Sequence, residues 1–289
     1  MSFSADDLVA LLDLEPLEEN IYRGSNRDIG TRRIYGGQVL AQALAAAQRT
    51  VEDSRLVHSL HGYFILAGDL AAPVVYFVDR LRDGGSFTTR RVTAIQHGRA
   101  IFNMAASFHK AEDGLEHQEP MPEAPAPDSL TPELELIRQR AGSIPSPLRE
   151  VLTQDRPLDF RPADQGDPFD NAPKAPQRTW WVRANGVLGD DPLIHRAVLA
   201  YASDYGLLVS AVRPHGMSFR DPRLMVASLD HSLWFHRPFR VDEWLLYVVE
   251  SPVAAGGRAF TRGTYYTRDG LLVASVAQEG LMRTVSPGR

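Results

Sequence analysis

The chain has 289 residues, of which 44% are hydrophobic, so it can bury one large core or two ordinary ones and is not disordered as a whole. Its 31 Lys and Arg against 36 Asp and Glu give a formal charge of −5 with no basic run, which argues against a nucleic-acid partner. It contains no cysteine, which excludes disulfides, thiolate nucleophiles and Cys-ligated metals and suits a reducing compartment.

The first 20 residues are acidic and weakly apolar, unlike a secretory signal peptide. No later stretch approaches the roughly 20 consecutive apolar residues of a membrane span. We therefore expect a cytoplasmic protein without a membrane span.

The first half predicts one helix followed by four strands. Residues 34–51 (IYGGQVLAQALAAAQRTV) are typical of an alanine-rich helix that opens with two glycines. Apolar runs separated by AGD, RDGG and QHG turn signals then predict antiparallel strands at 56–66, 73–81, 86–95 and 99–108.

A proline-rich segment follows, because 12 of the 20 prolines fall between Pro120 and Pro176. We interpret residues 116–176 as a linker between an N-terminal unit, 1–115, and a C-terminal unit, 177–289. Two short helices are expected within it, at 132–141 and 147–154, each with proline in its first turn. The rest is expected to lie over the surface.

The second half repeats the order of the first half. Residues 192–212 (PLIHRAVLAYASDYGLLVSAV) predict one continuous helix with Asp204 in its interior. Strands are expected at 225–236, 243–251, 258–267 and 271–282. An offset of 171 or 172 aligns Tyr76 with Tyr247 and Gly98 with Gly270, and an offset of 159 aligns the two helices.

One long apolar helix followed by an antiparallel meander predicts an α+β unit in which the sheet wraps around the helix. Two such units in one chain are expected to pair by pseudo-twofold symmetry. The predicted fold is therefore a double hotdog.

Three polar residues of the second half stand where the first half has apolar ones. At the helix offset of 159, Asp204 aligns with Ala45. At the strand offsets of 171 and 172, Ser228 aligns with Val57 and Gln278 with Ala106. Desolvating a carboxylate, a hydroxyl and an amide costs several kcal/mol unless they satisfy one another or water. The asymmetry predicts a site in the second half. Two alternatives stay open: a register error of one residue, or an Asp204 that only caps or bridges neighbouring groups.

At these residues the chain resembles the acyl-CoA thioesterase II family of double hotdog hydrolases. The resemblance covers nearly the whole chain, through motifs such as RIYGGQVLAQAL, DRLRDGGSFTTRRVTAIQHG, YASDYGLL, ASLDHSLWFHRPF and LVASVAQEGLMR. It implies that Asp204, Ser228 and Gln278 hold the lytic water. The hydroxyl residue, often threonine in the family, is serine here.

The resemblance also implies a chemistry without any cofactor or bound metal. A thioester carbonyl is electrophilic, so water needs orientation and a proton acceptor more than a protein nucleophile. We expect Asp204 to be the general base, with Ser228 and Gln278 orienting the water. A backbone N–H near a helix N-terminus or the Gln278 amide would meet the oxyanion, and the sequence leaves both open. The family further implies association of double hotdogs into dimers or tetramers.

Other interpretations are weaker. The chain lacks a G-x-S-x-G elbow for a serine nucleophile and H-E-x-x-H for zinc. His58 could be a base or a structural strand residue. Four arginines could contact coenzyme A phosphates or be solvated: Arg80, Arg82, Arg90 and Arg91. A hotdog enoyl-CoA hydratase would carry His five residues after its Asp, where this chain has Val209, and a non-catalytic acyl-CoA-binding protein would not need the polar trio.

Overall fold

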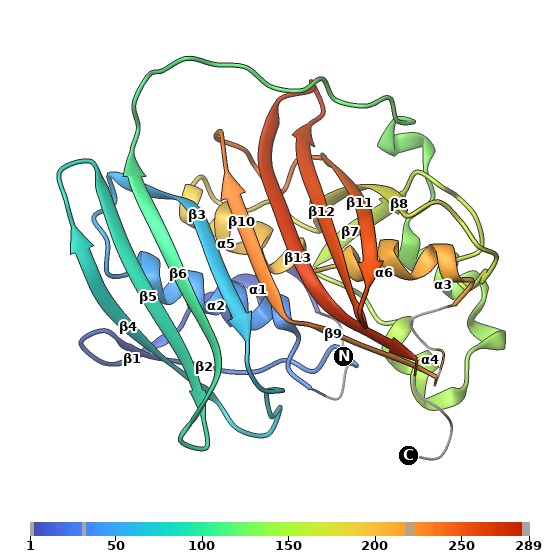
Figure 1. The fold of residues 1–289 in the computed structure, drawn as a ribbon, viewed down its shortest axis with the longest axis horizontal. Helices are drawn as coiled ribbons and strands as arrows, with labels where there is room; N and C mark the ends of the chain where they lie inside the picture. Colours follow the sequence, from blue (N-terminus) through green and yellow to red (C-terminus); the bar gives the residue numbers. More distant parts are fainter. Residues whose placement is uncertain (1–2, 31–32, 218–220, 222, 285–289) are drawn as a thin grey trace.

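The computed structural model describes residues 3–30, 33–217, 221 and 223–284 (Figure 1). The strands of the first half are β1 (Glu15–Glu18), β2 (Ile21–Gly24), β3 (Arg55–Phe64), β4 (Val74–Asp83), β5 (Phe87–Gln96) and β6 (Arg99–Lys110). The later strands are β7 (Leu158–Pro162), β8 (Gln177–Ala184), β9 (Leu224–Ser228), β10 (Asp230–Phe235), β11 (Leu245–Ala255), β12 (Arg258–Thr267) and β13 (Leu272–Thr284). All of these strands join one antiparallel sheet in the order β1-β2-β4-β5-β6-β3-β10-β13-β12-β11-β8-β7, with β9 paired to β13.

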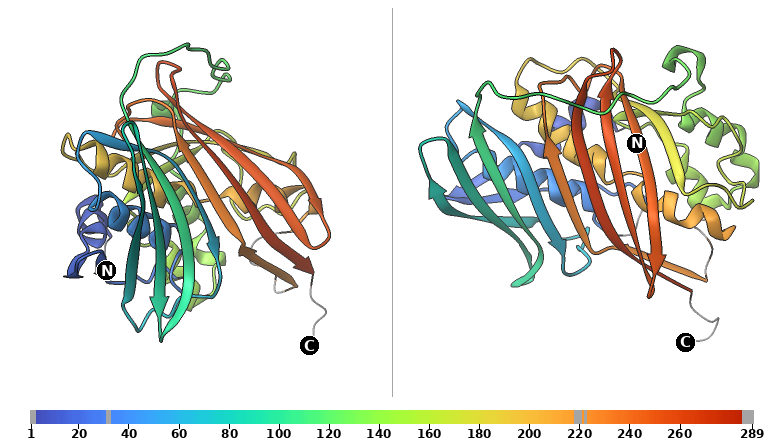
Figure 2. Two further views of the ribbon diagram at one scale, coloured as in Figure 1. Left: turned by 60° about the vertical axis from the view of Figure 1, so that its left-hand side comes forward. Right: turned by 45° about the horizontal axis from the view of Figure 1, so that its top comes forward.

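Helices cover one face of this curved sheet (Figure 2). Helix α2 (Gly36–Gln48) belongs to the first half and α5 (Pro192–Ser203) to the second, and the two pack against each other. The alanine-rich sequence of α2 favours the helix and lets its backbone approach its neighbours closely, and Leu40 and Leu44 are fully buried. A shorter helix, α1 (Ala5–Leu12), packs beside both.

The prediction of one continuous helix over 192–212 is wrong. Helix α5 begins at Pro192 behind the N-cap Asp191, whose side chain accepts a hydrogen bond from the Leu193 N–H. It ends at Ser203, and a second helix, α6 (Leu207–Val212), follows. Gly206 separates them with a φ of +77°, a left-handed conformation that ends helices and favours glycine. Asp204 is therefore the C-cap residue of α5 and not an interior helical residue.

The two halves join where β3 pairs with β10, and Leu60 lies opposite Leu233 in that ladder. The β-sheet registers of the halves agree at the offsets that the repeat predicts. Val57 pairs with Phe108 in the first half, and the aligned residues Ser228 and Gly280 pair in the second. The aligned turn glycines, Gly98 and Gly270, both have positive φ. The structure is thus an α+β double hotdog, as predicted. Leu60 and its aligned residue His231 are both fully buried, and Ala106 and Gln278 are each 1% exposed, so aligned residues lie on the same face of the sheet and the one-residue register error is excluded.

The proline-rich segment forms α3 (Glu133–Gln139) and α4 (Ser146–Leu152), together with two short 3-10 turns, Pro127–Ser129 and Ala141–Ser143. It does not lie over the surface throughout. Strand β7 pairs with β8 at the edge of the sheet, and Glu133 of α3 is buried. Among the helices of the described residues, none is long and apolar enough to cross a membrane.

Candidate active site

The structure brings the three predicted site residues together. Asp204 follows α5, Ser228 is the last residue of β9, and Gln278 lies on β13 two residues before the partner of Ser228. The Gln278 Nε2 donates to Asp204 Oδ1 at 2.7 Å and lies 3.1 Å from Ser228 Oγ. The Ser228 hydroxyl is 3.5 Å from the same carboxylate oxygen.

Burial controls the acidity of Asp204. Its side chain is 6% exposed, and this desolvation raises the pKa of the carboxyl from 3.8 to about 6. Smaller opposing effects come from the hydrogen bond of Gln278, the backbone N–H of Gly37 and the Ser228 hydroxyl. Near neutral pH the group is therefore an ionised carboxylate with more than ordinary basicity.

The N-terminus of α2 approaches this carboxylate from the first half. A Cβ added to Gly36 would lie 2.7 Å from Asp204 Oδ2 and 3.1 Å from the Phe64 ring, so glycine is required for the approach. Positive helix-end potential and backbone N–H groups therefore lie beside the acid.

The titratable groups that surround Asp204 stay uncharged. Burial raises the pKa values of the nearby Tyr35, Tyr201 and Tyr247 above their usual range. Burial also lowers the pKa of His231, on β10, to about 3, so its imidazole is neutral. The Asp204 carboxylate is consequently the single charge among these groups.

Sequence reasoning missed two buried polar residues beside the trio. His231 Nδ1 lies 3.2 Å from Gln278 Nε2, and His231 Nε2 lies 2.9 Å from Ser203 Oγ. A signal was available, because the same repeat offsets align His231 with Leu60 and Ser203 with Leu44. At both positions the second half again has a polar residue where the first half has an apolar one.

A cavity of about 830 Å³ contains Asp204, Ser228 and Gln278 in its wall. The proline-rich segment supplies much of its apolar lining: Ile137, Ile144, Val151, Leu152, Leu158 and Phe160. Helix α6 and β9 add Leu208, Val209, Val212 and Val226. A large, mainly apolar space thus opens directly from the polar trio.

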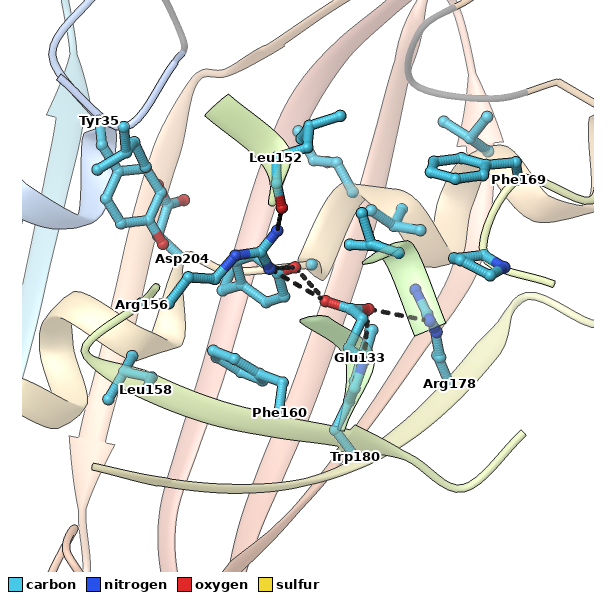
Figure 3. A pocket seen from close by; sticks show the side chains of 18 of the residues that line it. Tyr35, Glu133, Leu152, Arg156, Leu158, Phe160, Phe169, Arg178, Trp180 and Asp204 are labelled. Atoms are coloured by element: carbon cyan, nitrogen blue, oxygen red, sulfur yellow. Dashed lines mark hydrogen bonds and ion pairs between the residues drawn. The ribbon is translucent and has the colours of Figure 1, made fainter. Parts of the chain in front are cut away.

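A buried ionic cluster also lies in this cavity (Figure 3). Glu133 accepts from Arg178 at 3.2 Å, contacts Arg156 at 3.5 Å and receives hydrogen bonds from Tyr205 and Trp180. Because Tyr205 adjoins Asp204 in sequence, the cluster connects the linker helix α3 to the segment that carries the acid.

The other candidates lie elsewhere. His58, on β3, contacts Ser107 Oγ at 2.8 Å, and Arg90 is buried against Thr50 and Asp83. Arg80 contacts Asn20, Arg91 pairs with Asp79, and Arg82 is exposed on β4. In the described part of the chain, the cavity lining includes none of these residues.

Comparisons with known proteins agree with this architecture. Residues 23–109 match the family model described as the acyl-CoA thioesterase N-terminal domain, and residues 148–281 match the model described as acyl-CoA thioesterase. The chain is 39% identical over 283 residues to acyl-CoA thioesterase 2 of Haemophilus influenzae, covering 98% of this chain and 99% of that protein. It is 40% identical to human acyl-coenzyme A thioesterase 8, and the match covers 96% of this chain and 88% of that protein.

A solved structure agrees as well. The acyl-CoA thioesterase II TesB2 from Mycobacterium marinum superposes with a TM-score of 0.80 at 46% identity, covering 96% of this chain and 99% of that one. Sequence identities of 39 to 46% over nearly the full length show membership of the same family and not only a shared fold. The chain therefore belongs to the acyl-CoA thioesterase II family, whose members hydrolyse acyl-CoA thioesters.

Proposed function

We propose that this protein hydrolyses fatty acyl-CoA to a fatty acid and coenzyme A, with Asp204 as the general base for the attacking water. The observation that supports this most is a buried carboxylate with a pKa of about 6, hydrogen-bonded to Gln278 and open to a largely apolar cavity. Such a pKa lies close to working pH, where proton transfer by a base is most effective.

In the proposed reaction, Asp204 accepts a proton from water while the water oxygen bonds to the thioester carbonyl carbon. Ser228 orients the water through its hydroxyl, and Gln278 orients the carboxylate through its Nε2–H and the water through its Oε1 acceptor. Collapse of the tetrahedral intermediate breaks the carbon–sulfur bond and expels the coenzyme A thiolate. The proton held by Asp204 passes to that sulfur, which gives the free thiol and regenerates the carboxylate, and the fatty acid is the other product. No protein nucleophile and no cofactor is required.

The contacts of Gln278 favour one of the two candidate oxyanion donors. Its Nε2 has two hydrogens and three nearby acceptors, in Asp204, Ser228 and His231. Because the amide N–H groups of Gln278 are committed to protein partners, and the Gly37 N–H is committed to Asp204, we favour the backbone N–H of Gly36 at the α2 N-terminus as the oxyanion donor. The Cβ-free approach of Gly36 to the site supports this choice.

The apolar wall supports a fatty acyl chain as the part of the substrate that enters the cavity. Hydrocarbon burial stabilises binding by about 0.8 kcal/mol per CH₂, so cavity depth would set chain-length preference. A hydratase is less favoured because Val209 stands where that reaction needs a second polar group.

Free thiol released from acyl-CoAs of increasing chain length, followed with a thiol reagent, tests this function. We expect the wild type to release thiol and Asp204→Asn to lose this activity. Binding without thiol release would favour a non-catalytic acyl-CoA-binding protein, and hydration of an enoyl-CoA would favour the hydratase.

We also propose assembly into dimers or tetramers through the sheets, in the cytoplasm. Exposed apolar side chains on the first-half sheet support the assembly: Tyr63, Phe77, Leu81 and Phe87. Light scattering at the monomer mass of 32.1 kDa would contradict the assembly. The division into units 1–115 and 177–289 with a linker at 116–176 likewise stays a proposal.

A further inference from the structure

A chain of hydrogen bonds leads from the end of α5 to the acid. The Ser203 hydroxyl donates to the Ala200 carbonyl at 2.9 Å and lies 2.9 Å from His231 Nε2. His231 Nδ1 in turn lies 3.2 Å from Gln278 Nε2, which donates to Asp204 Oδ1 at 2.7 Å. Ser203 and His231 are fully buried, and Gln278 is 1% exposed.

The directions of these bonds determine the state of the imidazole. Because the Ser203 hydrogen points to Ala200, its oxygen accepts from His231, which requires the proton of the neutral ring to be on Nε2. Nδ1 then carries a bare lone pair and accepts only. It therefore fixes the Gln278 amide with its NH₂ toward His231 and Asp204.

The opposite amide orientation is unfavourable at both ends. It would place Gln278 Oε1 against the Asp204 carboxylate and against the lone pair of His231 Nδ1, two acceptor–acceptor contacts in a buried site. From this geometry we infer that His231, held by Ser203, is a positioning residue that sets the orientation of the Gln278 amide and through it the hydrogen bond to Asp204. This inference rests on the proposed roles of Asp204 and Gln278.

The first half supports a role beyond folding. At the aligned positions it has Leu44 and Leu60, and both are fully buried. The architecture therefore accepts leucine at these places. A buried imidazole and hydroxyl are unnecessary for packing the helix on the sheet.

The direct test measures the His231 tautomer and the Asp204 pKa by NMR, in the absence of substrate. Nitrogen NMR of ¹⁵N-histidine-labelled protein should show His231 as the neutral Nε2–H tautomer from pH 5 to 8. Carboxyl NMR of ¹³C-aspartate-labelled protein should show a higher Asp204 pKa in His231→Leu than in wild type, because an unfixed amide donates less well to the carboxylate. An Nδ1–H tautomer, or an unchanged Asp204 pKa in that variant, would overturn the inference.

The kinetic test uses a graded series of variants. We expect His231→Leu to lower kcat about 10- to 100-fold with little change in KM, and to shift the pH–rate profile to higher pH. His231→Asn keeps an acceptor close to the Nδ1 position and should recover most of the activity, whereas His231→Gln should not. Equal losses in the Asn and Gln variants would contradict the positioning role.

A matched control is available directly after the same strand, β10. His236 contacts Ser275 Oγ at 2.9 Å, which is also a histidine–serine pair, but His236 is exposed. His236→Leu should leave the Asp204 pKa unchanged. If His231→Leu fails to fold, Ser203→Ala provides the same readouts, since loss of the Nε2 acceptor should populate both tautomers. Absence of thioesterase activity in the wild type would reject the proposed function, and the NMR readouts would still decide the inference.

Discussion

The two halves of the molecule share one architecture, and five aligned positions at the site distinguish them. At these positions the second half has polar side chains and the first half has apolar ones. The polar residues are Ser203, Asp204, Ser228, His231 and Gln278, and the aligned residues are Leu44, Ala45, Val57, Leu60 and Ala106. Because one chain contains both sets of side chains, the first half shows that the fold does not require polar residues at these positions. We therefore attribute the polar residues of the second half to function.

The difference extends to the shape of the site. Phe108, fully buried, fills the position aligned with Gly280, while the Cβ-free Gly280 leaves room for Leu208 of α6. The helix break at Gly206 produces α6 and brings Leu208 and Val209 to the cavity wall. A pocket thus needs both the polar replacements and the interruption of the helix.

The largest expected effect is on catalysis by the acid. Asp204→Asn should lower kcat by a factor on the order of a thousand or more, because it removes the proton acceptor but keeps the shape. The same assay on Ala45→Ser, at the aligned position of the first half, should give wild-type rates. Activity lost in both folded variants would mean that the first half also carries a site.

The next effect is on stability and its dependence on pH. The folded-state pKa of Asp204, about 6, lies above its ordinary 3.8, so the folded protein binds the proton more tightly. The contribution of this group to the free energy of unfolding is therefore fully present below about pH 4. It falls by roughly 3 kcal/mol as the pH rises from 4 through 6. Asp204→Asn should remove this decline.

Urea titrations at pH 5 and pH 7.5, followed by Trp fluorescence, measure this effect. The Asn variant should match or exceed the wild-type midpoint at the higher pH. A clear loss of stability at pH 7.5 would mean that Asp204 is chiefly a structural cap.

The hydroxyl of Ser228 should have an intermediate effect. Ser228→Ala should lower kcat roughly 10- to 1,000-fold, as one orienting hydrogen bond is removed, whereas Ser228→Thr should remain active. The aligned Val57→Ser in the first half should leave the rate unchanged. An Ala variant as fast as wild type would remove Ser228 from the proposed mechanism.

The smallest expected effect concerns the two helix N-termini. Gly36 of α2 faces Asp204, while the aligned residue of α5 is the buried His195, so only the first position needs glycine. Gly36→Ala should lower kcat about 10-fold by displacing the carboxylate. Unchanged kinetics with an unchanged pH–rate profile would show that the close approach is unimportant for the reaction.

Much of this arrangement could be predicted because the repeat provides an internal alignment. The β-sheet registers of Val57 and Ser228 agree with the predicted offsets, so the trio could be found without coordinates. The end of α5 was also readable, since Gly206 follows Asp204 by two residues. No metal or catalytic motif marks His231, and only its alignment with the apolar Leu60 distinguishes it.

The linker contacts were beyond sequence reasoning. The burial of Glu133 depends on Arg156, Arg178 and Tyr205, which come from distant parts of the chain. No local periodicity encodes such a cluster. Its place in the cavity wall follows only from the packing of α3 against the second half.

The ladder between β3 and β10 has a consequence for the synthesis of this protein. Strand β3 is complete at Phe64, but its partner begins at Asp230, so the ribosome must make the whole linker and α5 before the ladder can form. Until then a newly made first half has an open strand edge, a template for pairing with other chains. Truncated or slowly translated chains should therefore aggregate, and the protection of this edge depends on completion of the second half.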